Sequence, residues 1–129
     1  MGYLVDTCVF IDHLTGRLPA PAQDMLEQQL GSGDLCTSVI VYHELLTGAQ
    51  SAGARGAVEQ LLAHWEVVPV DVAVAAEAAE LHRRWKAQGR TIAMADALIV
   101  ATARVRNLKV LTSNTKDFPD VVAVNPSDL

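Results

Sequence analysis

Short apolar runs alternate with longer helical stretches along the chain. The runs at residues 3–5, 35–37, 65–70, 108–112 and 121–124 are typical of buried strands. The stretches at residues 8–14, 19–31, 58–64, 72–88 and 94–104, and one that begins after Ser38, have the composition or spacing of helices. This alternation predicts an α/β fold of three layers, in which a central parallel sheet of four to five strands has helices on both faces.

Local signals set several boundaries of these elements. Ser38 is a good N-cap for the helix that follows it, and Gly89 is a natural C-cap for the helix that ends near residue 88. Pro69 ends the third strand. The small residues at 51–56 predict a turn rather than part of a helix.

Length and composition indicate one globular domain that spans residues 1–129, with half of the residues apolar. No apolar run approaches the length of a membrane-spanning helix, and residues 1–12 lack the basic segment of a signal peptide. Cys8 and Cys36 have no metal-ligand spacing, so we expect two buried thiols in a reducing compartment. These features together predict a cytoplasmic protein without a membrane partner.

The net charge of −5 argues against a nucleic-acid-binding protein, because such proteins are usually basic. The objection weakens if several acids serve one metal site, since a bound cation cancels their charge locally. Arg83, Arg84, Lys86 and Arg90 form one basic stretch. This stretch fits a surface that guides an RNA backbone and fits a solvated helix end equally well.

Two acids are placed where a ligand could reach them. In a parallel sheet the ligand crevice lies at the carboxyl ends of the strands, and Asp6 directly follows the first predicted strand. Taken alone, Asp6 fits an N-cap of the next helix better. Glu44 lies within a helix among apolar neighbours, where an acid is costly unless it is paired or binds a metal. An exposed position on the helix edge explains Glu44 equally well.

Asp96 gives the clearest signal, and a polar cluster follows the fourth predicted strand. After Asp96, every residue up to Ala103 except Thr102 is small or apolar, which indicates a buried helix with one carboxylate in its first turn. A plain N-cap is the weaker alternative for Asp96. Asn114 and Asp117 come after the fourth strand, although any loop has a similar composition.

Together these oxygen ligands favour Mg²⁺ or Mn²⁺ over Zn²⁺, because neither His nor Cys has a place in the pattern. Carboxylate-held Mg²⁺ is typical of phosphodiester cleavage. The sequence contains no Gly-rich phosphate loop and no Ser/His/Asp arrangement, and its four histidines stand in no motif. The residues therefore point to metal-dependent hydrolysis of a phosphodiester.

Four segments in this order resemble the PIN-domain nucleases, and in particular the VapC-type toxins of toxin–antitoxin pairs. They are YLVDTCV at residues 3–9, TSVIVYHEL at 37–45, DALIVATA at 96–103 and LTSNTKDF at 111–118. The third segment is the most specific, and the resemblance covers essentially the whole chain.

The resemblance implies that Asp6, Glu44 and Asp96 bind the metal. Some members carry the fourth acid at the position of Asn114 and others at that of Asp117. We expect Asp117 to fill this role, with Asn114 as an auxiliary contact, because an Asn can ligate only as a neutral amide. Thr7 and Thr112 would support these ligands through their hydroxyl groups.

The activity that the resemblance implies is Mg²⁺-dependent cleavage of RNA by a toxin, with Mn²⁺ as a substitute. A VapB-like antitoxin would place a segment, with an arginine, near the acids, and homodimers and toxin–antitoxin hetero-oligomers are expected. A PIN-type RNA-processing nuclease without an antitoxin and an inert PIN-like binding module are the alternatives. A phosphatase of another α/β fold would have a second Asp two residues after Asp6, where this chain has Cys8.

Overall fold

A parallel sheet of five strands forms the centre of the molecule. The computed structural model describes residues 2–129, and its strands follow the order β3-β2-β1-β4-β5. Every pair of neighbouring strands is parallel, as the alternation of elements predicted. The strands are β1 (Tyr3–Val5), β2 (Leu35–Ser38), β3 (Val67–Val68), β4 (Lys109–Leu111) and β5 (Ala123–Val124).

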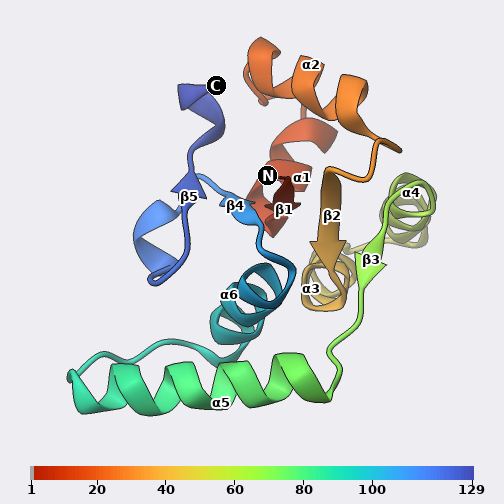
Figure 1. Cartoon of the computed structure of the whole chain (residues 1–129). Helices are drawn as coiled ribbons and strands as arrows, with labels where there is room; N and C mark the ends of the chain where they lie inside the picture. The colour runs from red at the N-terminus through yellow and green to blue at the C-terminus, as the bar shows by residue number, and fades with distance from the viewer. Residues whose placement is uncertain (1) are drawn as a thin grey trace.

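Helices cover the sheet and complete the predicted three-layer α/β/α fold. Figure 1 shows the sheet between α1 and α2 on one side and the packed pair α5 and α6 on the other. None of the helices within residues 2–129 is both long and apolar enough to span a membrane. The helices are α1 (Thr7–Leu14), α2 (Ala20–Gln29), α3 (Val39–Gly48), α4 (Ala52–Leu62), α5 (Val72–Ala87) and α6 (Met94–Arg106), with short 3₁₀ helices η1 (Thr115–Asp117) and η2 (Pro126–Asp128).

The order of the strands reverses around β1, and this reversal positions the site. After β1 the chain moves outward to β2 and β3, and it then returns to the other side of β1 through β4 and β5. In open parallel sheets a crevice forms outside the carboxyl ends of the strands at this kind of switch point. The residues that directly follow β1 and β4 therefore face the crevice.

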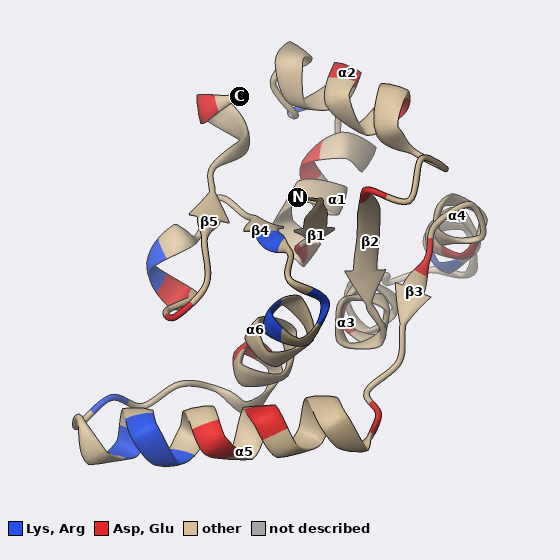
Figure 2. Cartoon of the chain, viewed as in Figure 1, with Lys and Arg blue, Asp and Glu red and all other residues tan. Residues whose placement is uncertain are grey.

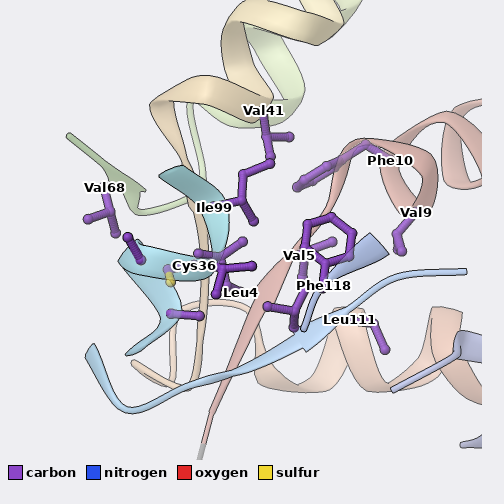
Figure 3. Close-up of a cluster of buried hydrophobic side chains, with 14 of the residues drawn as sticks. Leu4, Val5, Val9, Phe10, Cys36, Val41, Val68, Ile99, Leu111 and Phe118 are labelled. Atoms are coloured by element: carbon purple, nitrogen blue, oxygen red, sulfur yellow. The ribbon is translucent and has the colours of Figure 1, made fainter. Parts of the chain in front are cut away.

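The core holds β1 and α6 rigidly in place. Leu4 and Val5 of β1 are fully buried, and Figure 3 shows them beside Ile99, Leu111 and Phe118 from distant parts of the chain. Burial of one such side chain contributes about 1.5–3 kcal/mol. Six of the residues of α6 are buried, which confirms the prediction of a buried helix: Ala97, Ile99, Val100, Ala101, Thr102 and Ala103.

The predicted turn at residues 51–56 is wrong, because α4 already begins at Ala52. Ser51 is the N-cap, and its hydroxyl oxygen accepts a hydrogen bond from the Ala54 amide at 3.0 Å. This cap and the packing of Val58 and Leu62 in the core outweigh the two glycines of the helix. β1 has the predicted bounds and β2 extends one residue further, to Ser38, whereas the last three strands are shorter than predicted. The difference is largest for β3, which keeps only Val67–Val68 of residues 65–70.

Candidate active site

All four predicted acids line one pocket at the carboxyl ends of β1 and β4. The pocket has a volume of about 230 Å³, and none of the residues that line it is Lys, Arg or His. We call it the acidic pocket. Its lining consists of Asp6, Thr7, Cys8, Ile11, Glu44, Asp96, Asn114, Asp117 and Phe118.

Asp6 turns its carboxylate into the acidic pocket and does not cap α1. It occupies the N-cap position of that helix, but its side chain makes no capping hydrogen bond. Instead Oδ2 accepts a hydrogen bond from the Thr112 hydroxyl at 2.9 Å and lies 3.6 Å from Cys8 Sγ. Burial raises the pKa of Asp6, although the Thr7 backbone amide and the Thr112 hydroxyl act against this. The capping interpretation of this side chain is therefore wrong.

Thr112 joins the ends of the two strands that form the switch point. Its side chain is fully buried, and the same hydroxyl oxygen that donates to Asp6 accepts a hydrogen bond from the Asn114 amide at 3.0 Å. Because the Asn114 backbone amide holds the Thr112 hydroxyl in place, this hydroxyl fixes the orientation of the Asp6 carboxylate. This contact agrees with the supporting role that the sequence resemblance implied for Thr112.

Glu44 reaches the acidic pocket from the middle of α3. Its Oε1 accepts a hydrogen bond from the Thr7 hydroxyl at 2.9 Å. The side chain is half-buried, and its neighbours Val41 and Leu45 pack in the core. Glu44 thus faces the acidic pocket from the boundary between the buried and the exposed faces of α3.

Asp96 lies in the first turn of α6, where Ala93 and not Asp96 is the N-cap residue. The pKa of Asp96 is raised to about 6, first by burial and then by the negative charges of Asp6, Asp117 and Glu44, in that order. The interpretation of Asp96 as a plain N-cap is therefore wrong. Its carboxyl group lies within the electrostatic reach of the other three acids.

Asp117 and Asn114 both border the acidic pocket, at the two ends of the η1 turn. The Asp117 amide donates a hydrogen bond to the Asn114 carbonyl oxygen at 2.9 Å, which closes this turn. The structure therefore brings both candidates for the fourth position to the site. Asp117 alone adds a negative charge to it.

The acids share a pocket but do not form a closed cage. Within residues 2–129 no three Asp, Glu, His or Cys side chains are close enough to hold one ion among them. Mg²⁺ fits such an open arrangement, because it keeps several of its waters and uses one or two carboxylates. A structural Zn²⁺ site, in contrast, needs four protein ligands at close range. The set of oxygen donors and the space in the acidic pocket suit hydrated Mg²⁺ or Mn²⁺.

The expectation of a buried thiol is wrong for Cys8 and confirmed for Cys36. Cys8 is half-buried, and its Sγ lies 3.5 Å from the Thr112 hydroxyl and accepts a hydrogen bond from the Ser113 amide at 3.4 Å. Cys8 also lines the acidic pocket. Its position two residues after Asp6, in the first turn of α1, was the signal in the sequence that could have predicted this. Burial raises the pKa of Cys36 to about 11, which keeps that thiol protonated.

The basic stretch at residues 83–90 lies outside the lining of the acidic pocket. Figure 2 shows the basic residues gathered toward the C-terminal end of α5. Arg83 pairs with Glu80 on the same helix, and Arg84 lies 3.6 Å from Asp120. Pairing within the molecule supports the interpretation of this stretch as a solvated helix end more than that of a free RNA-binding surface.

The fold and the acidic pocket define an α/β domain with a cluster of carboxylates at its switch point. The family model for the PIN domain matches residues 3–124, and the chain belongs to the PIN-domain family. The chain is 36% identical over 123 residues to the ribonuclease VapC10 of Mycobacterium tuberculosis. This alignment covers 95% of the chain and 90% of the relative.

Solved structures agree with this assignment. VapBC-1 from nontypeable Haemophilus influenzae is 26% identical, with a TM-score of 0.81 and coverage of 98% of this chain and 99% of that one. VapBC2 from Rickettsia felis, solved with a DNA fragment from its promoter, has a TM-score of 0.83 at 22% identity and covers 97% and 98% of the two chains. The second likeness concerns the fold alone.

Proposed function

We propose that this protein is a Mg²⁺-dependent endoribonuclease, with Mn²⁺ as a substitute ion, and that Asp6, Glu44, Asp96 and Asp117 together hold the hydrated metal, one or two of them directly and the others through its bound waters. The observation that carries the proposal is the gathering of four carboxylates in one pocket whose lining has no basic residue. Repulsion among these charges destabilises the protein unless a cation binds. The ribonuclease name of the relative in M. tuberculosis supports RNA as the substrate.

Each acid has a defined task in this reaction. The Thr112 hydroxyl holds the Asp6 carboxylate, and the Thr7 hydroxyl holds that of Glu44, so both oxygens are aimed before an ion arrives. Asp96 and Asp117 bring the remaining negative charge from α6 and η1. When bound, the divalent ion supplies activation of water and neutralisation of charge at the phosphate. No side chain has to act as a nucleophile.

We further propose that the protein is a cytoplasmic toxin of a single PIN domain, which forms homodimers and is neutralised by a VapB-like antitoxin. An apolar groove of about 430 Å³ between α1, α3 and α4 supports a protein partner. It shares Ile11 and Glu44 with the acidic pocket, and Ile11 and Leu14 are about half exposed. An amphipathic segment packed in this groove could place an arginine against the acids.

A cleavage assay tests the nuclease. The purified chain should cut total RNA at defined sites when Mg²⁺ or Mn²⁺ is present and should lose this activity in chelator. Sequencing of the cut ends identifies the target. Asp6→Asn serves as the matched control against a contaminating nuclease, since it should be inactive in every preparation. Cleavage by clean wild-type protein that persists in chelator, or that survives Asp6→Asn, would contradict the mechanism.

A neutralisation assay tests the partner. Expression of the wild type should stop growth, and co-expression of its cognate VapB-like antitoxin should restore growth. Leu14→Asp puts a charge in the apolar groove, so it should keep the toxicity and escape the antitoxin. Val122→Asp, at a residue that is 56% exposed and lies outside both the groove and the acidic pocket, should remain neutralised. Equal neutralisation of both variants would place the partner elsewhere. An RNA-processing nuclease without an antitoxin would show no such protection in any variant.

A further inference from the structure

We infer that Asp120 is a positioning residue, which fixes the turn that carries Asp117 and thereby the metal affinity of the acidic pocket. The inference rests on the proposed function, because it assigns Asp120 a role through Asp117. Asp120 itself lies outside the lining of the acidic pocket.

The segment at residues 113–122 needs an anchor because it has little structure of its own. It connects the parallel strands β4 and β5, and it therefore runs from the carboxyl edge of the sheet back to the amino edge. Its only helical element is η1, a single 3₁₀ turn that ends at Asp117. One isolated turn does not hold its shape without tertiary contacts.

Three contacts from α5 and α6 supply this anchor at Asp120. Its Oδ2 accepts a hydrogen bond from Trp85 Nε1 at 2.6 Å and lies 3.6 Å from the Arg84 guanidinium. Its carbonyl oxygen accepts a hydrogen bond from the Arg104 guanidinium at 2.7 Å. Arg104 in turn pairs with Glu77 at 2.8 Å, which holds it in place. We call these contacts the Asp120 anchor.

The Asp120 anchor is rigid on both sides. Trp85 is 1% exposed, so its indole N–H has a fixed position in the core. Asp120 adopts a left-handed backbone conformation with φ of 64°, which Asp, Asn and Gly tolerate better than other residues. Phe118, between Asp117 and Asp120, is buried and secures the middle of the segment.

The Asp120 anchor links two acids of the site through one helix. Asp96 lies in the first turn of α6, and Arg104 lies in the last turn of the same helix. Since Arg104 holds the carbonyl of Asp120, the turn that carries Asp117 is attached to the helix that carries Asp96. The placement of Asp117 relative to Asp96 therefore depends on the Asp120 anchor.

The test compares Asp120→Gly with Asp120→Asn. Glycine keeps the left-handed backbone and removes the side chain, whereas asparagine keeps an oxygen that can accept the indole N–H. We expect Asp120→Gly to weaken Mn²⁺ binding, measured by calorimetry, about tenfold. Hydrogen exchange of the Asp117 and Phe118 amides should become faster, and Asp120→Asn should restore most of both properties.

The same substitution in the Asp117→Asn background shows whether Asp120 acts through Asp117. There Asp120→Gly should cause no further loss of Mn²⁺ affinity, because the carboxylate that it positions is absent. Glu80→Gln removes an exposed ion pair of α5 and is the matched control, which should leave Mn²⁺ binding unchanged. If Asp120→Gly does not fold, Trp85→Phe removes the N–H donor, keeps most of the ring packing and should shift Mn²⁺ binding in the same direction.

The outcomes separate the inference from the proposed function. Wild-type binding of Mn²⁺ with unchanged affinity in Asp120→Gly overturns the inference and leaves the proposed function standing. An equal loss of affinity in the Asp117→Asn background also overturns it, because Asp120 would then act by another route. A wild type that binds no Mn²⁺ and cuts no RNA overturns the proposed function, and the inference falls with it.

Discussion

Two clusters of charged residues at opposite edges of the sheet behave in opposite ways. At the carboxyl edge the acidic pocket gathers four carboxylates with no basic residue in its lining. At the amino edge a pocket of about 380 Å³ is bordered by Glu77, Arg104 and Asp120. There the Glu77 carboxylate pairs with Arg104, and the Asp120 carboxylate lies 3.6 Å from Arg84. The same chain thus pairs its charges at one edge and leaves like charges together at the other.

The difference separates a cluster that stabilises the fold from one that destabilises it. At the amino edge the Glu77–Arg104 pair joins α5 to α6. The Arg84–Asp120 pair and the hydrogen bond from Arg104 to the Asp120 carbonyl oxygen attach both helices to the segment that leads into β5. Like charges at the carboxyl edge repel each other, and burial adds to the cost, as the raised pKa values of Asp6 and Asp96 show. A cluster that destabilises the metal-free protein makes physical sense when a cation relieves the repulsion.

The largest effect is expected for Asp96→Asn, which keeps the size of the side chain and removes its charge. RNA cleavage should fall by about 100-fold or more, since even supporting residues of metal sites often contribute 10–100-fold. The free energy of unfolding without metal should rise, because one of several repelling charges is removed. The rise should be only about 1 kcal/mol, because solvent screens this partly exposed carboxyl group. Urea unfolding and cleavage should be measured on one preparation. Wild-type activity in this variant would make Asp96 a structural residue.

A smaller loss is expected for Thr112→Val, which removes the hydroxyl that holds Asp6. Mg²⁺-dependent cleavage should fall about 10–100-fold. Most of this loss should appear as a higher Mg²⁺ concentration needed for half-maximal activity, and less of it as a lower rate at saturating Mg²⁺. Thr102→Val is the matched control, since Thr102 is equally buried but its hydroxyl donates to the Leu98 carbonyl within α6. Equal losses in the two variants would mean that packing, and not the contact with Asp6, is responsible.

The stability of the metal-free protein should depend on pH through Asp96. Its folded-state pKa of about 6 lies above the ordinary value of 3.8, so the native state binds a proton more tightly than the unfolded state. The free energy of unfolding should therefore fall as the pH rises from about 4 to about 7. Asp6, whose pKa is also raised, acts in the same direction. Urea unfolding in chelator should show a weaker fall in Asp96→Asn than in the wild type, and equal slopes would contradict this account.

The smallest effect is expected at the paired amino edge. Glu77→Gln removes the charge of an ion pair whose side chains are about one-third exposed, so the loss of stability should be about 0.5 kcal/mol. RNA cleavage should stay within about twofold of the wild type, because the Gln side chain keeps an oxygen that can accept the hydrogen bond from Arg104, and the Asp120 anchor and the carboxylates of the acidic pocket are therefore kept. A gain in stability after Glu77→Gln would show that this cluster, too, holds repelling charges, and the contrast between the edges would fail.

Much of the site follows from local sequence patterns. The run that ends at Asp6 and the apolar helix after Asp96 predicted where these acids lie, because strand and helix periodicities are local properties. The beginning of α4 was missed, since glycines at 53 and 56 disguise a helix that Ser51 and the core stabilise. The half-exposed position of Cys8 was missed for a related reason, since burial depends on packing between elements.

The sequence by itself determined the alternation of strands and helices, the parallel sheet and the identity of the acids at its carboxyl edge. Only the tertiary structure decided how the acids are held and which charges are paired. The hydroxyl that orients Asp6 comes from Thr112, which is 106 residues away along the chain. The partner of Asp120, Trp85, is 35 residues away. Such contacts depend on the order in which the strands assemble around β1, and a periodic pattern within one element carries no information about that order.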